Sequence, residues 1–469
     1  MDYKKILQNF GVAVLAQGTS VLASCATTLL VPKVLGVAAF GYWQLFVFYT
    51  TYAGIFHLGL NDGVYLLIGG QRRNEVDKDS VKSQFLVGAV AQGIFAIIIG
   101  TLAFFSQPDP NRRFVIIVFA MWMFINNIAW YLGYVFQAIN ETQLFSIATL
   151  IDRFLFLVAL IFLLLAKEHL FQVYVIGYLI TRIISLFYTL WKGRDFLSAK
   201  CLSIRDSIVE TINSVRIGIK VMIAGVASLA ILGVARVVID HVWGIEVFGK
   251  ISFALSMCNF FLSFITQVSM VLFPALRQGT RQERIHFYER ARNCMDIVLP
   301  ALYLAYFPLV IILALWLPQY RSSLSAFALV LPICVFDSKM NVLGTTYLKV
   351  LRKEKILLAV NVAAVALSIC LVLLALLIFH SPNAVIGAGA VTLIVRYLVT
   401  QHILAKDLNV DTPVMGQVTE LAFTAVFVFS ALMLDTLPAF AVVLVAYGLY
   451  CLCNRRIVTD VVKALKKIR

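Results

Sequence analysis

The chain has 469 residues, of which 61% are hydrophobic and 13% are charged, and it carries a formal net charge of +15. Soluble domains have about a quarter charged residues, so this composition excludes an ordinary soluble protein. The positive charge does not indicate a nucleic-acid partner either. The basic residues lie in short loops between apolar runs, where such residues set membrane topology.

Fourteen apolar runs follow one another along the chain. Each approaches or exceeds the length of about 20 residues that a helix needs to cross the hydrocarbon layer. In lipid, a chain with this pattern must be helical to satisfy its backbone polar groups. We place the runs at roughly residues 10–31, 41–69, 84–105, 114–136, 144–166, 170–191, 217–239, 248–275, 295–317, 325–347, 356–379, 384–404, 417–435 and 438–454.

The loops between these runs alternate in charge. Lys and Arg gather in the N-terminus, in the second, sixth, eighth and tenth connections and in the C-terminal tail, whereas the intervening loops hold few. Because cytoplasmic loops carry the excess of basic residues, we expect a multi-pass membrane protein with both termini in the cytoplasm. The expected location, the bacterial or archaeal cytoplasmic (inner) membrane, is what the family resemblance described below implies. In the longest loop and just beyond it, Ile208, Ile212, Val215 and Ile219 share one helical face, which predicts a helix lying in the inner interface.

The chain also repeats itself. Glycine stands at the third position and Phe-Gly at the seventh and eighth of both "VLGVAAFGYWQLFVF" (Val34–Phe48) and "VWGIEVFGKISFALS" (Val242–Ser256). Two further pairs match at nearly the same offset of about 210 residues: Trp130–Phe145 with Asn341–Ile356, and Val175–Gly177 with Val385–Gly387. Each repeat then holds six spans, so both copies enter the membrane from the same side. This predicts a parallel repeat of the kind found in secondary transporters.

We therefore predict an all-α polytopic membrane protein. Its fourteen transmembrane helices form two six-helix lobes, related by a parallel pseudo-twofold axis, plus two C-terminal helices. The predicted parts are an N-lobe at 1–191, a cytoplasmic linker with the interfacial helix at 192–216, a C-lobe at 217–405, the last two spans at 406–455 and a basic cytoplasmic tail at 456–469.

Cations within the predicted spans include Arg153, Arg182, Arg236, Lys339 and Arg396. A charge at this depth costs about 2.5–3.5 kcal/mol on insertion scales, and such residues mark substrate pathways or ion pairs. We name all five as candidate cavity cations that hold an anionic cargo. The structural alternative is an ion pair within one lobe, such as Arg153 with Asp152, Lys339 with Asp337 or Arg236 with Asp240. Arg236 could also snorkel to the interface.

His57, Asn61 and Asp62 share one face of the second span, and glycines nearby would let that helix bend. We name these three residues as candidates for coupling transport to a proton or a sodium ion. The alternative is a polar helix kink held by hydrogen bonds. The equivalent positions of the second repeat carry no charge, so symmetric packing does not require the cluster.

Markers of an enzyme are missing from the sequence. The eight cysteines show no metal-ligand spacing, and most lie within apolar runs, so we expect neither a metal site nor a disulfide framework. No phosphate-binding glycine loop and no nucleophile triad appears. We expect a protein that is not an enzyme and needs no cofactor.

Several of these motifs resemble the Wzx-type polysaccharide flippases. The resemblance lies in Leu35-Gly36-x-x-x-Phe40-Gly41, "HLGLNDG" (His57–Gly63), "FQAINETQLFS" (Phe136–Ser146), the run Phe248–Leu276 and "VIGAGAVTLIVRYL" (Val385–Leu398). The family belongs to the multidrug/oligosaccharidyl-lipid/polysaccharide (MOP) superfamily, which also contains lipid II flippases and MATE proteins. The resemblance implies a flippase that moves a polyprenyl-diphosphate-linked oligosaccharide from the inner to the outer leaflet by alternating access. A polysaccharide polymerase and a chain-length regulator would be its partners.

Two other functions remain open at this point. A MATE-type drug/cation antiporter would need a cavity dominated by acids, whereas the deep charges here are mostly basic. A membrane-embedded polysaccharide polymerase would need a large external loop with catalytic carboxylates, whereas the loops predicted to lie outside are short.

Overall fold

The computed structural model describes residues 3–278, 280–411, 414–455 and 457–459. The described residues form helices and no strand, and the chain divides into two compact units, Met1–Leu229 (unit 1) and Ala230–Arg469 (unit 2). The prediction of an all-α membrane protein is confirmed. The boundary between the units falls within one long helix, inside the predicted seventh span.

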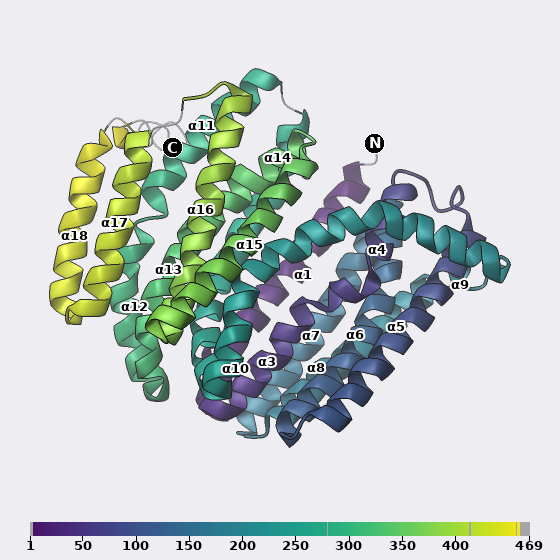
Figure 1. Ribbon diagram of the computed structural model, residues 1–469. Coiled ribbons are helices and arrows are strands. Elements are labelled where there is room, and N and C mark those ends of the chain that lie inside the picture. Colours follow the sequence, from purple (N-terminus) through teal and green to yellow (C-terminus); the bar gives the residue numbers. More distant parts are fainter. Residues whose placement is uncertain (1–2, 279, 412–413, 456, 460–469) are drawn as a thin grey trace. The chain divides into compact units, whose positions relative to one another are not determined.

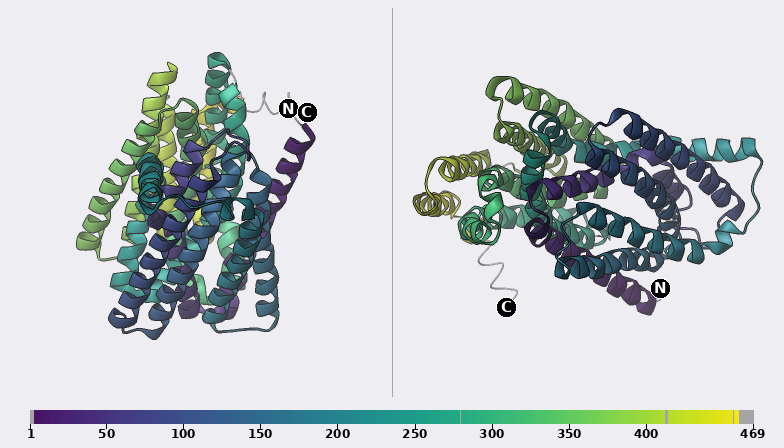
Figure 2. Two further views of the ribbon diagram at one scale, coloured as in Figure 1. Left: turned by 90° about the vertical axis from the view of Figure 1, so that its right-hand side faces the viewer. Right: turned by 90° about the horizontal axis from the view of Figure 1, so that it is seen from below.

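Unit 1 is a bundle in which α5, α6, α7 and α8 run side by side, as Figure 1 and the two views in Figure 2 show, and α1 packs against α7. Its elements are α1 (Tyr3–Leu29), α2 (Val31–Leu35), α3 (Val37–Thr51), η1 (Ala53–His57), α4 (Leu60–Leu67), α5 (Lys78–Ser106), α6 (Pro110–Ala138), α7 (Thr142–Leu165), α8 (Phe171–Lys192), α9 (Arg194–Leu197) and the first part of α10 (Ile204–Gln278).

In unit 2, α13 and α15 both pack against α16, and α17 packs against α18. Its elements after α10 are α11 (Arg281–Val298), α12 (Leu302–Trp316), η2 (Pro318–Ser323), α13 (Leu324–Lys339), η3 (Met340–Thr345), α14 (Thr346–Val350), α15 (Glu354–Phe379), α16 (Pro382–Leu408), α17 (Val414–Met433) and α18 (Thr436–Cys453).

Among the described helices, eleven are long and apolar enough to cross a membrane, or twelve if the bent pair α11 and α12 is one span. The predicted count of fourteen is therefore not confirmed. Two departures of the observed helices from the predicted spans have a local cause. The second predicted span is broken into α3, η1 and α4, and the seventh and eighth predicted spans are merged into α10, whose helical conformation is interrupted at Gly244.

The repeated corner has the same backbone in both copies. Gly36 has φ 75° and ψ 178°, and Gly244 has φ 79° and ψ −176°. Only glycine adopts this region readily, because a Cβ would clash with the backbone there. In each copy the phenylalanine four residues on, Phe40 or Phe248, is buried. The match supports the internal repeat that the sequence predicts.

Aromatic rings fill the interior of each unit. In unit 1 the Trp43 ring stacks on Phe156 at 5.9 Å between centroids, and in unit 2 Tyr303 stacks on Phe427 at 4.4 Å. Aliphatic side chains instead cover outward faces, as on α5, where Ile94, Ile97 and Ile98 are exposed. In water such an exposed apolar face would be unfavourable, so these faces fit contact with lipid.

Candidate functional site

The second span bends where α3 gives way to η1 and α4. Leu58 and Gly59 both adopt left-handed backbone conformations, with φ of 52° and 86°, and two such residues in a row end the helix. The backbone N–H of Gly59 donates to Nδ1 of His57 at 3.0 Å. Because Nδ1 accepts this hydrogen bond, the imidazole is neutral and carries its proton on Nε2, which lies 3.9 Å from Oδ2 of Asp62. The bend therefore joins the two titratable candidates.

Where α10 crosses the bend, small residues on both segments let the two backbones come into direct contact. A Cβ added to Gly63 would lie 1.8 Å from the carbonyl oxygen of Ser214, and one added to Gly218 would lie 2.0 Å from the carbonyl oxygen of Gly59. Gly59 and Gly63 on one segment thus face Ser214 and Gly218 on the other, a pair of small-xxx-small motifs of the kind that brings membrane helices together.

The first part of α10 turns its polar side to the protein. Its buried residues between positions 204 and 220, spaced three or four apart, are Ser207, Thr211, Ser214 and Gly218. Ser214 Oγ donates to Oε1 of Gln84 on α5 at 2.6 Å. Ile208 and Ile212, which the sequence predicted for a membrane interface, are exposed. Val215, predicted for the same face, instead packs against a buried cluster of unit 1, and Ile219 is half-buried. The contacts of Ser214 and Gly218 fix this part of the chain on the bend and on α5.

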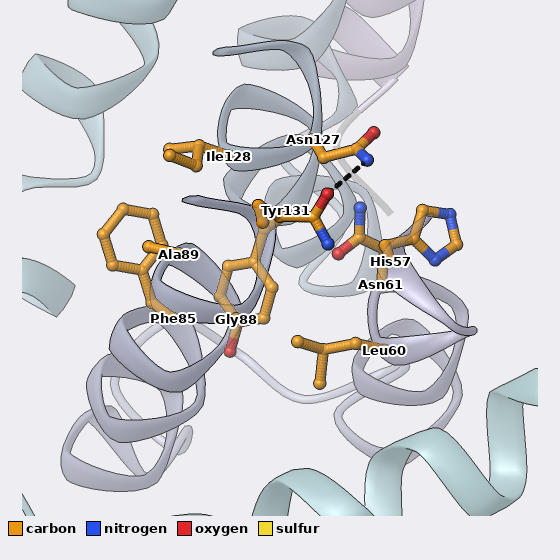
Figure 3. Close-up of a pocket in the computed structure, with 10 residues that line it drawn as sticks. His57, Leu60, Asn61, Phe85, Gly88, Ala89, Asn127, Ile128 and Tyr131 are labelled. Carbon is orange, nitrogen blue, oxygen red and sulfur yellow. Dashed lines mark hydrogen bonds between the residues drawn. The ribbon is translucent and has the colours of Figure 1, made fainter. Parts of the chain in front are cut away.

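Beside the bend lies a small pocket with mixed polar and apolar lining, shown in Figure 3. Amides from three elements meet there: Asn127 Nδ2 of α6 donates to Oε1 of Gln92 at 2.8 Å and to the Ala53 carbonyl at 2.9 Å, and Gln92 Nε2 donates to the Phe56 carbonyl at 2.6 Å. These bonds satisfy the carbonyls that the broken helix leaves open. The buried Nδ2 of Asn61 has no hydrogen-bond partner among the described residues and borders the same pocket.

A second polar cluster of unit 1 joins α7 and α8. Two guanidinium groups share one carboxylate: Nε of Arg153 lies 4.0 Å and NH1 of Arg182 lies 3.6 Å from Oδ2 of Asp152. Arg153 also donates to the hydroxyl of Tyr178 at 2.9 Å. Arg182 is buried and its Nε has no partner among the described residues, whereas the Arg153 side chain is 36% exposed. The cluster thus carries one positive charge more than its carboxylate neutralises.

In unit 2, Arg396 of α16 lies beside one carboxylate. Its NH1 is 3.6 Å from Oδ1 of Asp337 on α13, and Asn341 donates to the same carboxylate at 3.3 Å. Arg236 on α10 donates to Ser252 Oγ at 2.9 Å, and its guanidinium lies 5.0 Å from the centre of the Phe248 ring. Both arginines are therefore held by groups of their own unit.

Lys339 is fully buried between two carboxylates. Its ammonium lies 2.7 Å from Oδ1 of Asp296, and it also contacts Oε1 of Glu420 on α17 directly. The suggested partner Asp337 is wrong, because that carboxylate lies beside Arg396 instead. In this conformation the charge of Lys339 is balanced inside unit 2, and it ties α17 to the rest of the unit.

Within each unit the candidate cations differ in their partners. Arg153 and Arg182 come together in unit 1, and Arg396, Lys339 and Arg236 have separate partners in unit 2. His57, Asn61 and Asp62 do meet, at the bend. The part of the chain that the structure describes holds no group of three or more His, Cys, Asp or Glu side chains placed to bind a metal ion.

A comparison of the sequence with protein families identifies the family of this chain. The family described as polysaccharide biosynthesis protein matches residues 6–280, which is more than half of the chain. The chain belongs to this family. No curated protein matches the chain at the sequence level.

Solved structures with the same fold include transporters and a flippase. An inward-facing MATE family multidrug resistance transporter of the MOP superfamily has a TM-score of 0.61 at 12% identity, over 86% of this chain and 98% of its own. The lipid II flippase MurJ, in an inward closed conformation, has a TM-score of 0.58 at 10% identity, over 97% of this chain and 100% of its own. A MOP superfamily transporter from Pyrococcus furiosus, described as having a binding pocket of reverse polarity, has a TM-score of 0.53 at 13% identity, over 87% and 97%. This polysaccharide biosynthesis protein therefore has the MOP superfamily fold.

Proposed function

We propose that the chain is a flippase that moves a polyprenyl-diphosphate-linked oligosaccharide from the inner to the outer leaflet by alternating access. Three observations support the proposal: membership in the polysaccharide biosynthesis family, a fold shared with a lipid II flippase, and unneutralised positive charge within the spans. The chain acts as a transporter and catalyses no bond breakage, and the glycan reaches it from other proteins.

The observation that carries the choice of cargo is the pair Arg153 and Arg182 around the single carboxylate of Asp152. A second guanidinium without its own counter-ion is costly at membrane depth unless it serves an anion. The planar fork of an arginine suits a phosphate oxygen pair, and Arg153, whose side chain is 36% exposed, offers donors to a diphosphate. If either Arg153 or Arg182 is removed, the other arginine still neutralises Asp152. A substitution can therefore remove the excess positive charge without leaving a buried carboxylate unpaired.

A drug/cation antiporter fits these charges less well. Such a protein needs carboxylates free to hold an organic cation. Here Asp152, Asp296, Asp337 and Glu420 each lie within 4 Å of an Arg or Lys side chain. Asp152 and Asp337 are neutralised by arginines, and Asp296 and Glu420 share the single charge of Lys339, so each carboxylate of this set already has a basic partner, which favours an anion as the cargo.

The bend of the second span supplies a place where a coupling ion acts. A proton that reaches Nδ1 of His57 must displace the hydrogen bond from the Gly59 N–H, so protonation of the ring and the shape of the bend are linked. The imidazolium would then pair with Asp62 on the same side of the bend. We propose that this change biases the helix between two conformations during transport. A sodium ion held by Asp62 is the alternative form of the same coupling.

The proposed orientation of the chain rests on the charge of its loops, and the proposed membrane rests on the proposed function. We propose the cytoplasmic membrane with both termini inside, and a polymerase and chain-length regulator as working partners. Outward movement of an anion is then favoured by the inside-negative potential, by about 2.3 kcal/mol per charge per 100 mV. Genes for glycosyltransferases beside the gene for this chain would support this setting.

The experiment is a flipping assay in proteoliposomes with a fluorescent polyprenyl-diphosphate oligosaccharide. Arg182→Gln should lower the rate about tenfold or more, equivalent to a loss of ~1.4 kcal/mol or more. The thermal unfolding of the variant should stay near that of the wild type because Arg153 still neutralises Asp152. Lys349→Gln, which removes one exposed charge from α14, is the matched control. An unchanged rate for Arg182→Gln would contradict the assigned cargo site.

A further inference from the structure

At the end of α8 nearest α9, one arginine holds three segments together. Arg73 donates from NH2 to the carbonyl of Lys192 at 2.7 Å and to Oδ1 of Asp195 at 2.8 Å, and from NH1 to Oε2 of Glu141 at 2.5 Å. Its guanidinium also lies 5.1 Å from the centre of the Phe196 ring. The loop before α5, the loop after α6 and the α8–α9 junction are therefore fixed relative to one another.

An open hollow of about 280 Å³ lies on this framework. It is lined by Arg73, Trp191, Lys192, Arg194 and Asp195. The ammonium of Lys192 lies 4.2 Å from the centre of the Trp191 ring, so the two side chains form one edge. Arg194 is exposed at the first position of α9.

The charges around the hollow do not balance. Arg73 and Lys78 are both engaged by carboxylates, since Lys78 lies 2.9 Å from Oδ2 of Asp195 and Arg73 contacts Asp195 and Glu141. Among the described residues, no carboxylate forms an ion pair with Lys192 or Arg194. Two positive charges are thus left over in a hollow whose shape is held by the Arg73 contacts.

An exposed apolar stripe on α8 leads to the same place. Ile180, Ile184, Phe187 and Trp191 follow one another at intervals of three or four residues, and all four are exposed. This spacing puts them on one face of the helix. Tryptophan at the end of such a stripe, followed by basic residues, is the pattern of a helix end at the membrane–water interface.

We propose that the hollow binds the phosphate of an anionic phospholipid whose acyl chains lie along the α8 stripe. Lys192 and Arg194 bind the phosphodiester oxygens, and Trp191 packs beside the glycerol region. Arg73 is a positioning residue, because it orders the loop and the α8–α9 junction without offering its own charge. A phosphodiester on a lipid is favoured over free phosphate because the apolar stripe of α8 ends beside Lys192 and Arg194. One amphipathic molecule can therefore contact the stripe with its acyl chains and the two cations with its headgroup. The site is separate from the cargo cluster at Asp152 and does not depend on the proposed transport.

The test is native mass spectrometry of the full chain, released from detergent that contains equimolar phosphatidylglycerol and phosphatidylcholine. The wild type should retain phosphatidylglycerol in preference to phosphatidylcholine. The double variant Lys192→Gln/Arg194→Gln should lose this preference about tenfold or more, since each basic side chain near an anionic headgroup contributes severalfold to binding. The double variant Lys349→Gln/Lys355→Gln removes the same charge from exposed positions that do not line the hollow, and it should behave as the wild type.

Two further experiments distinguish a bound lipid headgroup from free phosphate and locate the bound lipid. Excess inorganic phosphate should leave the retained lipid unchanged, whereas displacement of the lipid by phosphate would overturn the assignment to a lipid headgroup. Phosphatidylglycerol with brominated chains should quench a fluorescence component that Trp191→Phe removes. Equal retention of phosphatidylglycerol by the Lys192→Gln/Arg194→Gln variant, with its unfolding temperature unchanged, would overturn the site itself.

Discussion

Gly63 lies against the carbonyl of Ser214 so closely that a methyl group on its Cα would come within 1.8 Å of the oxygen. The contact joins the bent second span to the first part of α10, and both partners are backbone atoms that cannot rotate away. The bend at Leu58 and Gly59 and the seat of the linker helix are therefore parts of one packing arrangement.

The first prediction concerns this crossing. Gly63→Ala should destabilise the protein by about 1–3 kcal/mol or more, because the new methyl group forces two backbones apart. Thermal unfolding in detergent measures the effect. Gly177→Ala on α8 is the matched control, since a Cβ at Gly177 would meet nothing within 4 Å. Equal unfolding temperatures for the two variants would show that the helices do not approach as described.

The second prediction concerns the shared carboxylate of α7. Asp152→Asn should destabilise unit 1 by about 3–5 kcal/mol, because it leaves Arg153 and the buried Arg182 without a counter-ion. Adding Arg182→Gln to Asp152→Asn should recover most of this stability, because one of the two uncompensated cations is then gone. The measurement is the unfolding free energy of the single and double variants. Additive losses in the double variant would contradict the shared pairing.

The third prediction concerns the buried lysine of α13. Lys339→Met should destabilise unit 2 by about 3–5 kcal/mol, because Asp296 and Glu420 would be left buried without a cation. Glu420→Gln should cost much less, since Lys339 and Asp296 remain as a balanced pair. Expression level and unfolding temperature report the difference. A milder effect for Lys339→Met than for Glu420→Gln would argue against the assigned contacts.

The fourth prediction concerns coupling at the bend. Asp62→Asn should abolish the dependence of flipping on external pH or on sodium, because the only carboxylate beside His57 in the described structure loses its charge. Flipping rates across a pH series, with and without sodium, measure the effect. Asp435→Asn, an exposed carboxylate before α18, serves as the control. Full activity with an unaltered pH profile in Asp62→Asn would remove the coupling role.

The fifth prediction concerns acid sensitivity at the α8–α9 junction. Burial by itself would raise the pKa of Asp195, but hydrogen bonds and charge from Arg73 and Lys78 outweigh it and lower the pKa to about 2. A depressed carboxylate pKa stabilises the fold above the ordinary value near 3.8, and this contribution is lost as the pH falls toward 2. The unfolding temperature of the wild type should therefore fall more steeply between these pH values than that of Asp195→Asn. Parallel curves would contradict the contact.

Much of the fold could be predicted because apolar runs and glycine corners are local signals. The runs locate most helices, and the matched corners at Gly36 and Gly244 indicate the repeat that their backbone angles support. The span count was harder to predict. A broken span and two spans merged across Gly244 cannot be distinguished from straight helices by hydropathy alone.

The candidate residues could be named from the sequence, whereas their partners could not. Asp337 is close to Lys339 in sequence, but residues two apart on a helix point to different sides, and the actual partners Asp296 and Glu420 come from other helices. Gln92 and Asn127 were missed although they are amides within apolar runs. Burying a polar group costs free energy for amides as well as for charged groups. A search of the apolar runs for amides would therefore have identified both residues as candidates.

The central claim is that the spans hold positive charge for an anionic, lipid-linked cargo. The most direct measurement places the purified chain in proteoliposomes and compares the transport of a polyprenyl-diphosphate oligosaccharide with that of an organic cation such as ethidium. Transport of the lipid-linked glycan, weakened by Arg182→Gln, together with no transport of ethidium, is the result expected. Transport of ethidium without movement of the glycan would contradict the account.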